Sequence, residues 1–393
     1  MIRKSFIELT FEAASIERWN DHIRPSRGFT ELDKQAHKML YAYVLGKMTD
    51  SINWLKLIEG GIFSFLQRLL MTDIKPPIFH KLMEEKGEEI NRWVLSTLKG
   101  HVDSVPNGFY EKMERYLLED SYARCEKEIL EAAHYLATKW EFDIIYGMCG
   151  SYYGIEDTKR EIDGKLDTFQ GIEGFQKFRR DQNLMGFTNL MGELRFQQRW
   201  SRVTRVPATS VMGHTFVVAL LSYLCSCEIG ACSARTVNNF LGGLFHDMPE
   251  VLTRDIVSPV KNSVEGLDAI IKQIEDSQMN DVIYPLLPEE WQQQLNYFTQ
   301  DEFCGKIVRD GQVVMCSSDE ISARYNDEKF SPVDGEIIRG CDHLSAYLET
   351  YISHSSGVTP HTLTNANREL YEQYRNQIIG GVNFGVLFDY FRI

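Results

Sequence analysis

The chain has 393 residues, of which 43% are hydrophobic and 12% aromatic, so it can bury a sizeable core and form two or three domains. Its net charge of −14 argues against extended binding to a nucleic-acid backbone, although a small phosphate ligand needs only a few local cations. Residues 1–6 lack the apolar core of a signal peptide, and the longest apolar run, 216–227, is too short to span a bilayer. We therefore expect no membrane association. The eight cysteines show no regular framework, so we expect reduced thiols and a cytoplasmic location.

Apolar residues recur at intervals of three and four along most of the chain, and this periodicity predicts an all-α protein. The expected helices are 32–46, 111–118, 123–139, 214–227, 235–252, 264–278, 289–298, 336–354 and 366–378. Residues 304–334 are expected to be a loop-rich insertion around the turn Arg309-Asp310-Gly311, where a two-stranded hairpin can form.

Two parts of the chain also match each other in sequence. The matches are Arg18-Trp19 with Arg199-Trp200, Gly60-Gly61-Ile62-Phe63 with Gly242-Gly243-Leu244-Phe245, Asp73-Ile74 with Asp255-Ile256, and His134-Tyr135-Leu136-Ala137 with His343-Leu344-Ser345-Ala346. Short matches arise by chance, but these keep the same order along the chain. The sequence therefore predicts a tandem duplication, with residues 1–150 and 193–393 as the two copies and 151–192 as their polar connector.

The second copy contains a candidate metal site. His246 and Asp247 stand next to each other in an apolar helical segment, where an ionised carboxylate must be paired, hydrogen-bonded or bound to a metal. His214 lies in an apolar helix upstream and Asp342 in one downstream, so these four residues can surround one divalent ion. The donor set suits Mn²⁺, Co²⁺, Fe²⁺ or Zn²⁺. Such an ion lowers the pKa of a bound water and supplies the attacking nucleophile near neutral pH. Glu250, one helical turn after His246, is the candidate for proton transfer.

The first copy lacks these residues. Ser64, Phe65, Arg68 and Ala133 stand where the second copy has His246, Asp247, Glu250 and Asp342. His37 can correspond to His214 when a gap of several residues is allowed between the matched segments. A single imidazole cannot hold a catalytic ion, so we predict that the first copy binds no metal.

The order of a lone His, a His-Asp pair and a distant Asp resembles the HD-domain metal-dependent phosphohydrolases. No histidine lies between Asp247 and Asp342, which distinguishes this chain from the HD enzymes that hold two metals. The flanks are similar to the bacterial 5′-deoxynucleotidase family, in Arg199-Trp200, His246-Asp247-Met248-Pro249-Glu250-Val251-Leu252-Thr253-Arg254-Asp255, Ser258-Pro259-Val260-Lys261 and Cys341-Asp342-His343-Leu344-Ser345-Ala346-Tyr347-Leu348-Glu349. Departures are Arg254 where the family has Gly, Gly213 where Glu is common, and Cys341 where the family has Ala.

This resemblance implies a role for each residue of the motif. Arg199 would hold the phosphate, Trp200 would crowd the 2′ position of the sugar, Asp255 would contact the sugar, and Glu250 would lie beside the attacking water. Lys261 is a further candidate substrate contact. Three alternatives stay open: Arg199-Trp200 as a structural cation–aromatic pair, Asp255 as a cap, and Lys261 as a surface lysine.

We therefore expect an all-α tandem HD-domain protein with one divalent metal ion, which releases phosphate from nucleotides, with 5′-deoxynucleoside monophosphates as the expected substrates. The alternatives are an HD nucleotide pyrophosphohydrolase or triphosphohydrolase, and a nucleotide-binding regulator with little turnover. Because single-domain members of the family are homodimers, the two copies are expected to pair as an intramolecular pseudo-dimer. Further homo-oligomerisation stays open.

Overall fold

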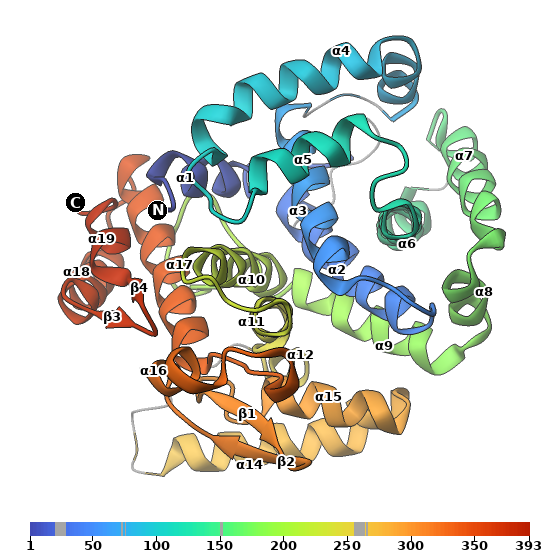
Figure 1. Cartoon of the computed structure of the whole chain (residues 1–393). Coiled ribbons are helices and arrows are strands. Elements are labelled where there is room, and N and C mark those ends of the chain that lie inside the picture. The colour runs from blue at the N-terminus through green and yellow to red at the C-terminus, as the bar shows by residue number, and fades with distance from the viewer. Residues whose placement is uncertain (20–28, 72–73, 75, 150–151, 255–263, 265) are drawn as a thin grey trace. The chain divides into compact units, whose positions relative to one another are not determined.

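The computed structural model describes the chain apart from residues 20–28, 72–73, 75, 150–151, 255–263 and 265 (Figure 1). The chain divides into two compact units, Met1–Phe178 and Arg179–Ile393. Helices dominate both units, and the strands among the described residues form two short antiparallel ribbons. The expected all-α class is confirmed, and all eight cysteines are free thiols.

Unit 1, residues 1–178, is built around helix α2, which packs against α3 and α6. Its helices are α1 (Lys4–Glu12), α2 (Glu31–Lys47), α3 (Trp54–Leu70), α4 (Pro76–Val102), α5 (Phe109–Leu118), α6 (Arg124–Cys149), α7 (Ile155–Thr168) and α8 (Glu173–Arg180), the last of which ends just past the unit boundary. A capping box between Thr30 and Asp33 begins α2, because each side chain accepts a hydrogen bond from the backbone N–H of the other.

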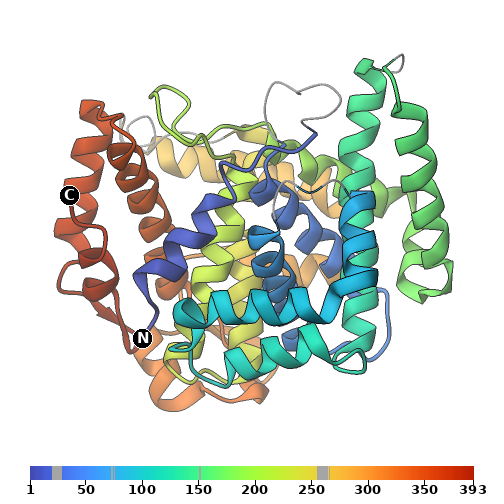
Figure 2. The same ribbon diagram turned by 90° about the horizontal axis from the view of Figure 1, so that it is seen from above.

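Unit 2, residues 179–393, is built around helix α10, which packs against α11 and α17; α18 and α19 lie against α17 (Figures 1 and 2). Its helices are α9 (Gln182–Gly192), α10 (Val211–Glu228), α11 (Ser233–Phe245), α12 (Glu250–Thr253), α14 (Leu267–Gln278), α15 (Glu289–Thr299), α16 (Ser318–Glu320), α17 (Gly335–Ser355), α18 (His361–Tyr374) and α19 (Phe384–Asp389). Its strands are β1 (Lys306–Arg309), β2 (Gln312–Met315), β3 (Ile378–Ile379) and β4 (Val382–Asn383).

Helix α10 is apolar on every side, and such a helix belongs in a core or in a membrane. Among the described residues it is the one helix long and apolar enough to cross a bilayer, and 94% of it is buried within the protein.

The segment 151–192 was expected to connect the two copies. It contains the three helices α7, α8 and α9.

The helix expected at 235–252 is interrupted. Helix α11 ends at Phe245, and α12 begins at Glu250. Pro249 has no N–H to donate to the carbonyl of Phe245 four residues earlier, and its ring would clash with that carbonyl in a continuous helix. The Phe245 carbonyl instead accepts a hydrogen bond of 2.9 Å from the N–H of Met248. His246 and Asp247 therefore stand on a turn between two helices.

The hairpin that the sequence allowed at 304–334 is present. Strands β1 and β2 pair from Lys306 opposite Met315 to Arg309 opposite Gln312. The two turn residues between them, Asp310 and Gly311, have φ angles of 51° and 76°. Positive φ at both central positions is the turn geometry that Asp-Gly favours and that suits the twist of paired strands.

Helices α10 and α11 approach each other closely at Gly243. A Cβ atom at this position would lie 2.8 Å from Cα and 2.9 Å from N of Ala219. Both of these are backbone atoms of α10, which cannot move aside as the end of a side chain can. Glycine at 243 therefore permits the close approach of α10, which carries His214, and α11, which ends just before His246.

We expect Gly243→Ala to separate α10 from α11 and to destabilise unit 2 by about 1–3 kcal/mol, the usual range for overpacking. Urea unfolding measures this difference. The matched control is Gly186→Ala in α9 of the same unit, where the added Cβ meets its nearest neighbour at an ordinary 3.6 Å. Because alanine is the better helix former, the control should gain up to about 1 kcal/mol. Equal stability of the two variants would contradict the packing argument.

Candidate metal centre

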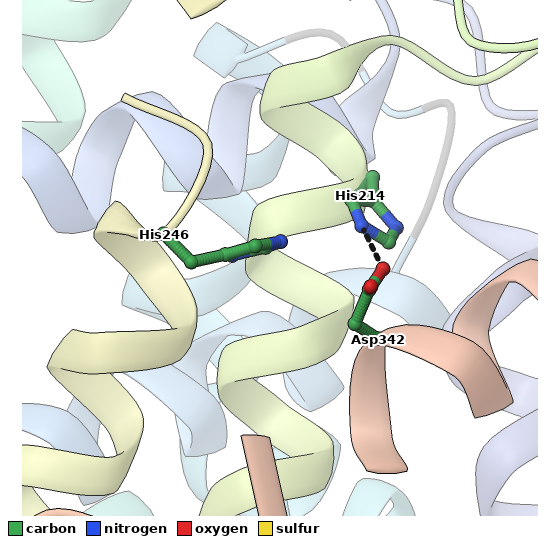
Figure 3. Close-up of side chains that lie close together, drawn as sticks. All are labelled: His214, His246 and Asp342. Carbon is green, nitrogen blue, oxygen red and sulfur yellow. Dashed lines mark ion pairs between the residues drawn. The ribbon is translucent and has the colours of Figure 1, made fainter. Parts of the chain in front are cut away.

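Three helical segments of unit 2 bring His214, His246 and Asp342 together. Figure 3 shows His214 on α10, His246 just past the end of α11, and Asp342 on α17. One nitrogen or oxygen atom from each lies within 4.8 Å of the other two. The shortest of these contacts joins Nε2 of His214 to Oδ1 of Asp342 at 3.0 Å. Residues far apart in sequence therefore form one cluster of metal-binding groups.

Asp247 lies in the same cluster. Its Oδ1 is 3.2 Å from Nε2 of His246, and its Oδ2 is 3.7 Å from Nε2 of His214. The imidazole side chains are at most 1% exposed, whereas the side chains of Asp247 and Asp342 are 17% and 20% exposed. All four residues predicted as metal ligands thus lie together, and solvent reaches the cluster on its carboxylate side.

Both imidazoles are oriented through their Nδ1 atoms. Nδ1 of His246 lies 2.8 Å from the carbonyl oxygen of Gly243, so this nitrogen carries the proton and donates it. Nδ1 of His214 lies 3.0 Å from Oγ of Ser345, one turn after Asp342 on α17. Both Nε2 atoms are buried and face the carboxylates of the cluster, at 3.0 Å from Asp342 for His214 and 3.2 Å from Asp247 for His246. When it is deprotonated, an Nε2 atom held in this way presents a lone pair to a divalent metal ion, so the donor set fits such an ion.

The charges of the cluster stabilise one another. Burial alone would lower the pKa of His246, but the charge and hydrogen bond of Asp247 outweigh this effect and raise the pKa to about 9. Burial would likewise raise the pKa of Asp342, yet the facing His214 and His246 hold it well below its usual range. Two partly buried carboxylates that face each other's imidazole partners are stabilised by positive charge beside them, which imidazole protons or a divalent cation can supply.

Arg199 lies next to this cluster, with its NH1 atom 4.0 Å from Oδ2 of Asp247. Its Nε donates to Oε2 of Glu349 at 3.3 Å. The neighbouring Trp200 donates from Nε1 to the same oxygen at 2.7 Å. Trp200 has a φ angle of 55°, which is rare for a bulky residue and persists only where the surroundings enforce it. One buried carboxylate thus holds both residues of the Arg-Trp motif.

Glu349 has a role in this site that the sequence analysis did not assign. Its other oxygen, Oε1, accepts a hydrogen bond from Thr209 and lies 3.4 Å from NH2 of Arg205. Burial would raise its pKa, but the charges of Arg205 and Arg199 lower it to about 2. Glu349 follows Asp342 by two helical turns on α17, and that spacing is the signal that places both on one helix face. We call Arg199, Trp200, Arg205, Thr209 and Glu349 the Glu349 cluster.

Backbone hydrogen bonds fix the position of Glu250 after the turn that carries His246 and Asp247. Its N–H donates to the carbonyl of Asp247 at 3.1 Å, so it begins α12 directly after the turn that carries the cluster. Gln197 donates from its side chain to the carbonyls of Glu250 and Val251, which ties α12 to the segment leading to Arg199. Asp255 and Lys261 lie outside the described residues.

Arg254 is exposed and has a φ angle of 64° with ψ of 161°. This backbone region is nearly restricted to glycine, since a Cβ atom clashes with the neighbouring peptide. The glycine that the resembling family has at this place fits the observed backbone, whereas Arg254 occupies it under strain.

Unit 2 is thus a helical bundle with a His, His-Asp and Asp cluster whose donor atoms fit a divalent metal ion. Residues 191–371 match the model of a family described as HD domain. This match supports membership of unit 2 in the HD-domain superfamily, whose members in general bind divalent metals and act as phosphohydrolases. No curated protein and no solved structure matches the chain.

We expect Glu349→Gln to destabilise unit 2 by about 3 kcal/mol at pH 7, the free energy that corresponds to a pKa lowered from 4.5 to about 2. Because the folded-state pKa is the lower one, this stability is fully present above pH 4.5 and is lost as the pH falls towards 2. Urea unfolding at several pH values should show the two proteins converging in acid.

The matched control is Glu372→Gln, which breaks an exposed ion pair with Arg375 in the same unit. Surface pairs contribute about 1 kcal/mol or less. A pH-independent difference between Glu349→Gln and the unmodified protein would contradict the charge-based account of the Glu349 cluster.

Proposed function

We propose that unit 2 is a metal-dependent phosphohydrolase that releases phosphate from 5′-deoxynucleoside monophosphates. The observation that supports it is the position of Arg199, whose guanidinium lies 4.0 Å from a carboxylate of the His/Asp cluster. A phosphate group held by this arginine would lie directly beside the ion bound by His214, His246, Asp247 and Asp342. Arginine suits this task because its planar, permanently charged group matches phosphate oxygens.

The chain's own groups divide the work of the reaction. Arg199 binds and orients the phosphate, and Glu349 fixes the direction of its guanidinium. A divalent ion, when bound, lowers the pKa of a water molecule and neutralises phosphate charge. Glu250, at the start of α12, takes a proton from the attacking water and returns it to the leaving sugar oxygen.

The surroundings of Arg199 favour a monophosphate over a longer phosphate chain. Arg205 is only 1% exposed and is engaged by Glu349 and Thr209, so it belongs to the interior rather than to a substrate pocket. A triphosphate needs several accessible cations, and among the described residues of this site Arg199 is the one placed beside the His/Asp cluster. The indole of Trp200, fixed by its bond to Glu349, would limit the space near the sugar and so select deoxyribose.

We further propose that the two units derive from one duplicated sequence. Pairing of the units as an intramolecular pseudo-dimer stays a prediction.

Phosphate release from ribo- and deoxynucleoside mono-, di- and triphosphates, measured with Mn²⁺, Co²⁺ and EDTA, tests the proposed substrate class. We expect metal-dependent release from deoxynucleoside monophosphates and little from the corresponding ribonucleotides. Release of pyrophosphate or triphosphate would instead establish the pyro- or triphosphohydrolase. Metal binding with no turnover of any nucleotide would favour the regulator.

Two variants separate metal binding from proton transfer. Asp247→Ala removes a carboxylate of the cluster and should abolish both metal content and turnover. Glu250→Ala should keep the metal and lower turnover by about 10²–10⁴-fold, the usual contribution of a general acid–base group. Metal content by mass spectrometry and kcat by phosphate release give the two readouts. Asp319→Ala and Glu290→Ala, at exposed positions of the same unit, are the controls. Undiminished turnover in Asp247→Ala would refute the metal assignment.

A further inference from the structure

Unit 1 contains a second cluster with the same design as the Glu349 cluster. Arg18 donates from Nε to both carboxylate oxygens of Glu141, at 3.2 and 3.0 Å, and Trp19 donates from Nε1 to Oε2 of Glu141 at 2.8 Å. Trp19 has a φ angle of 64°, against 55° for Trp200. The backbone N–H of Arg18 donates to the carbonyl of Phe29, as that of Arg199 donates to Thr209.

These common features define a register, that is, an alignment of residue positions in unit 1 with residue positions in unit 2. Thr30 caps α2 as Ser210 caps α10, and the fourth residue after the cap is Lys34 in unit 1 and His214 in unit 2. Counting seven residues back from the cluster carboxylate gives His134 in unit 1 and Asp342 in unit 2. This register differs from the sequence matches, which set His37 against His214 and Ala133 against Asp342. His37 is fully buried and stacks on Tyr41 with ring centroids 4.7 Å apart.

In this register Lys34 of unit 1 stands where unit 2 has the proposed metal ligand His214, and a second lysine, Lys38, follows one helical turn later. Nζ of Lys34 lies 3.0 Å from Nε2 of His134, so the two counterparts of His214 and Asp342 are again in contact. Ser64, the counterpart of His246, accepts a hydrogen bond of 2.6 Å from Nζ of Lys38. An ammonium group cannot ligate a metal ion, and it repels one. The same place in unit 1 is therefore suited to an anion.

Among the described residues, neither Lys34 nor Lys38 forms an ion pair with a carboxylate, and their nearest polar partners are His134 and Ser64. The neighbouring Arg18 and Arg68 contact two acidic partners. These partners are Glu31, which lies 3.0 Å from Arg18 and 3.8 Å from Arg68, and Glu141, which lies 2.9 Å from Arg18. The remaining buried carboxylate on this stretch of α2, Asp33, binds Thr30 at the helix start.

Burial makes a positive charge on these two lysines unfavourable. Lys34 and Lys38 are 1% and 4% exposed. Desolvation lowers the pKa of Lys34 well below its usual value and that of Lys38 to about 8. Buried charges in proteins are normally paired, and an anion at this place would pair them. The side chain of Arg68 is 21% exposed, which leaves the cluster open to solvent on that side.

We propose that unit 1 binds the phosphate group of a small molecule at Lys34, Lys38 and Arg68, without a metal ion and without hydrolysing it. Lysine and arginine are the side chains that bind phosphate oxygens most strongly, through charge-assisted hydrogen bonds. The shared ligand chemistry is a dianionic phosphate, supplied either by inorganic phosphate or by a phosphomonoester such as a nucleotide. The site would make unit 1 a binding domain attached to the unit that carries the metal centre.

The test uses the full chain with His246→Ala and Asp247→Ala in EDTA, so that unit 2 holds no metal. Calorimetric titration with inorganic phosphate and with deoxyadenosine 5′-monophosphate should each show one site. Adding Lys34→Met, which removes the charge and keeps the length, should weaken binding at least tenfold. Lys34→Arg should retain it. The matched control is Lys139→Met, which removes a lysine of α6 that is 24% exposed and paired with Asp143.

Arg68→Gln, at the partly exposed edge, gives a second variant that decides the matter if Lys34→Met fails to fold. It too should weaken phosphate binding at least tenfold. Unchanged affinity in a folded Lys34→Met or Arg68→Gln protein, binding of deoxyadenosine as tight as its monophosphate, or no phosphate binding at all would overturn the proposal. Turnover is not measured, so this result is independent of the hydrolase proposed for unit 2.

Discussion

Two arginines, a tryptophan and a threonine converge on the buried carboxylate of Glu349, and the geometry of the metal centre depends on this convergence. A buried carboxylate is stable only with its counter-charges in place, and removing one partner of such a pair is costly. Arg199 is therefore held at a fixed distance from α17. Because Asp342 lies on the same face of α17 two turns earlier, one helix determines how far Arg199 stands from the His/Asp cluster.

His246 and Asp247 lie on the turn between α11 and α12, whereas His214 and Asp342 lie within helices. Pro249 ends α11 at Phe245, and the resulting turn brings Asp247 within 3.2 Å of His246 and 3.7 Å of His214. A backbone contact to Gly243 then fixes the ring of His246. The close approach that Gly243 allows between α10 and α11 thus serves the site as well as the core.

The helices expected at 32–46, 214–227 and 336–354 are present as α2, α10 and α17, and local signals in the sequence predicted them and the four residues that cluster. Apolar periodicity marks helices such as α10, and the costly placement of His246-Asp247 in an apolar segment marks a site. The Asp310-Gly311 hairpin followed from the turn preference of those two residues. Glu349 escaped prediction because a glutamate on a helix is usually exposed, and its partners lie some 150 positions away in sequence. The correspondence of Lys34 to His214 was missed because the sequence matches do not show where the alignment gap between the two copies lies. The helix cap at Thr30 shows this position in the structure.

The presence of Arg-Trp in both units bears on what Arg199 does. In each unit the motif donates to a buried glutamate and gives its tryptophan a positive φ, so part of its role is structural and independent of metal. The two arginines differ at NH1. In unit 1 this atom of Arg18 lies 3.0 Å from the buried Glu31, which satisfies it within the protein. In unit 2 residue 211 is Val, and NH1 of Arg199 instead faces Asp247 at 4.0 Å, beyond a normal hydrogen bond. Valine at position 211, where unit 1 has Glu31, therefore leaves an arginine that holds the fold together and also faces the His/Asp cluster.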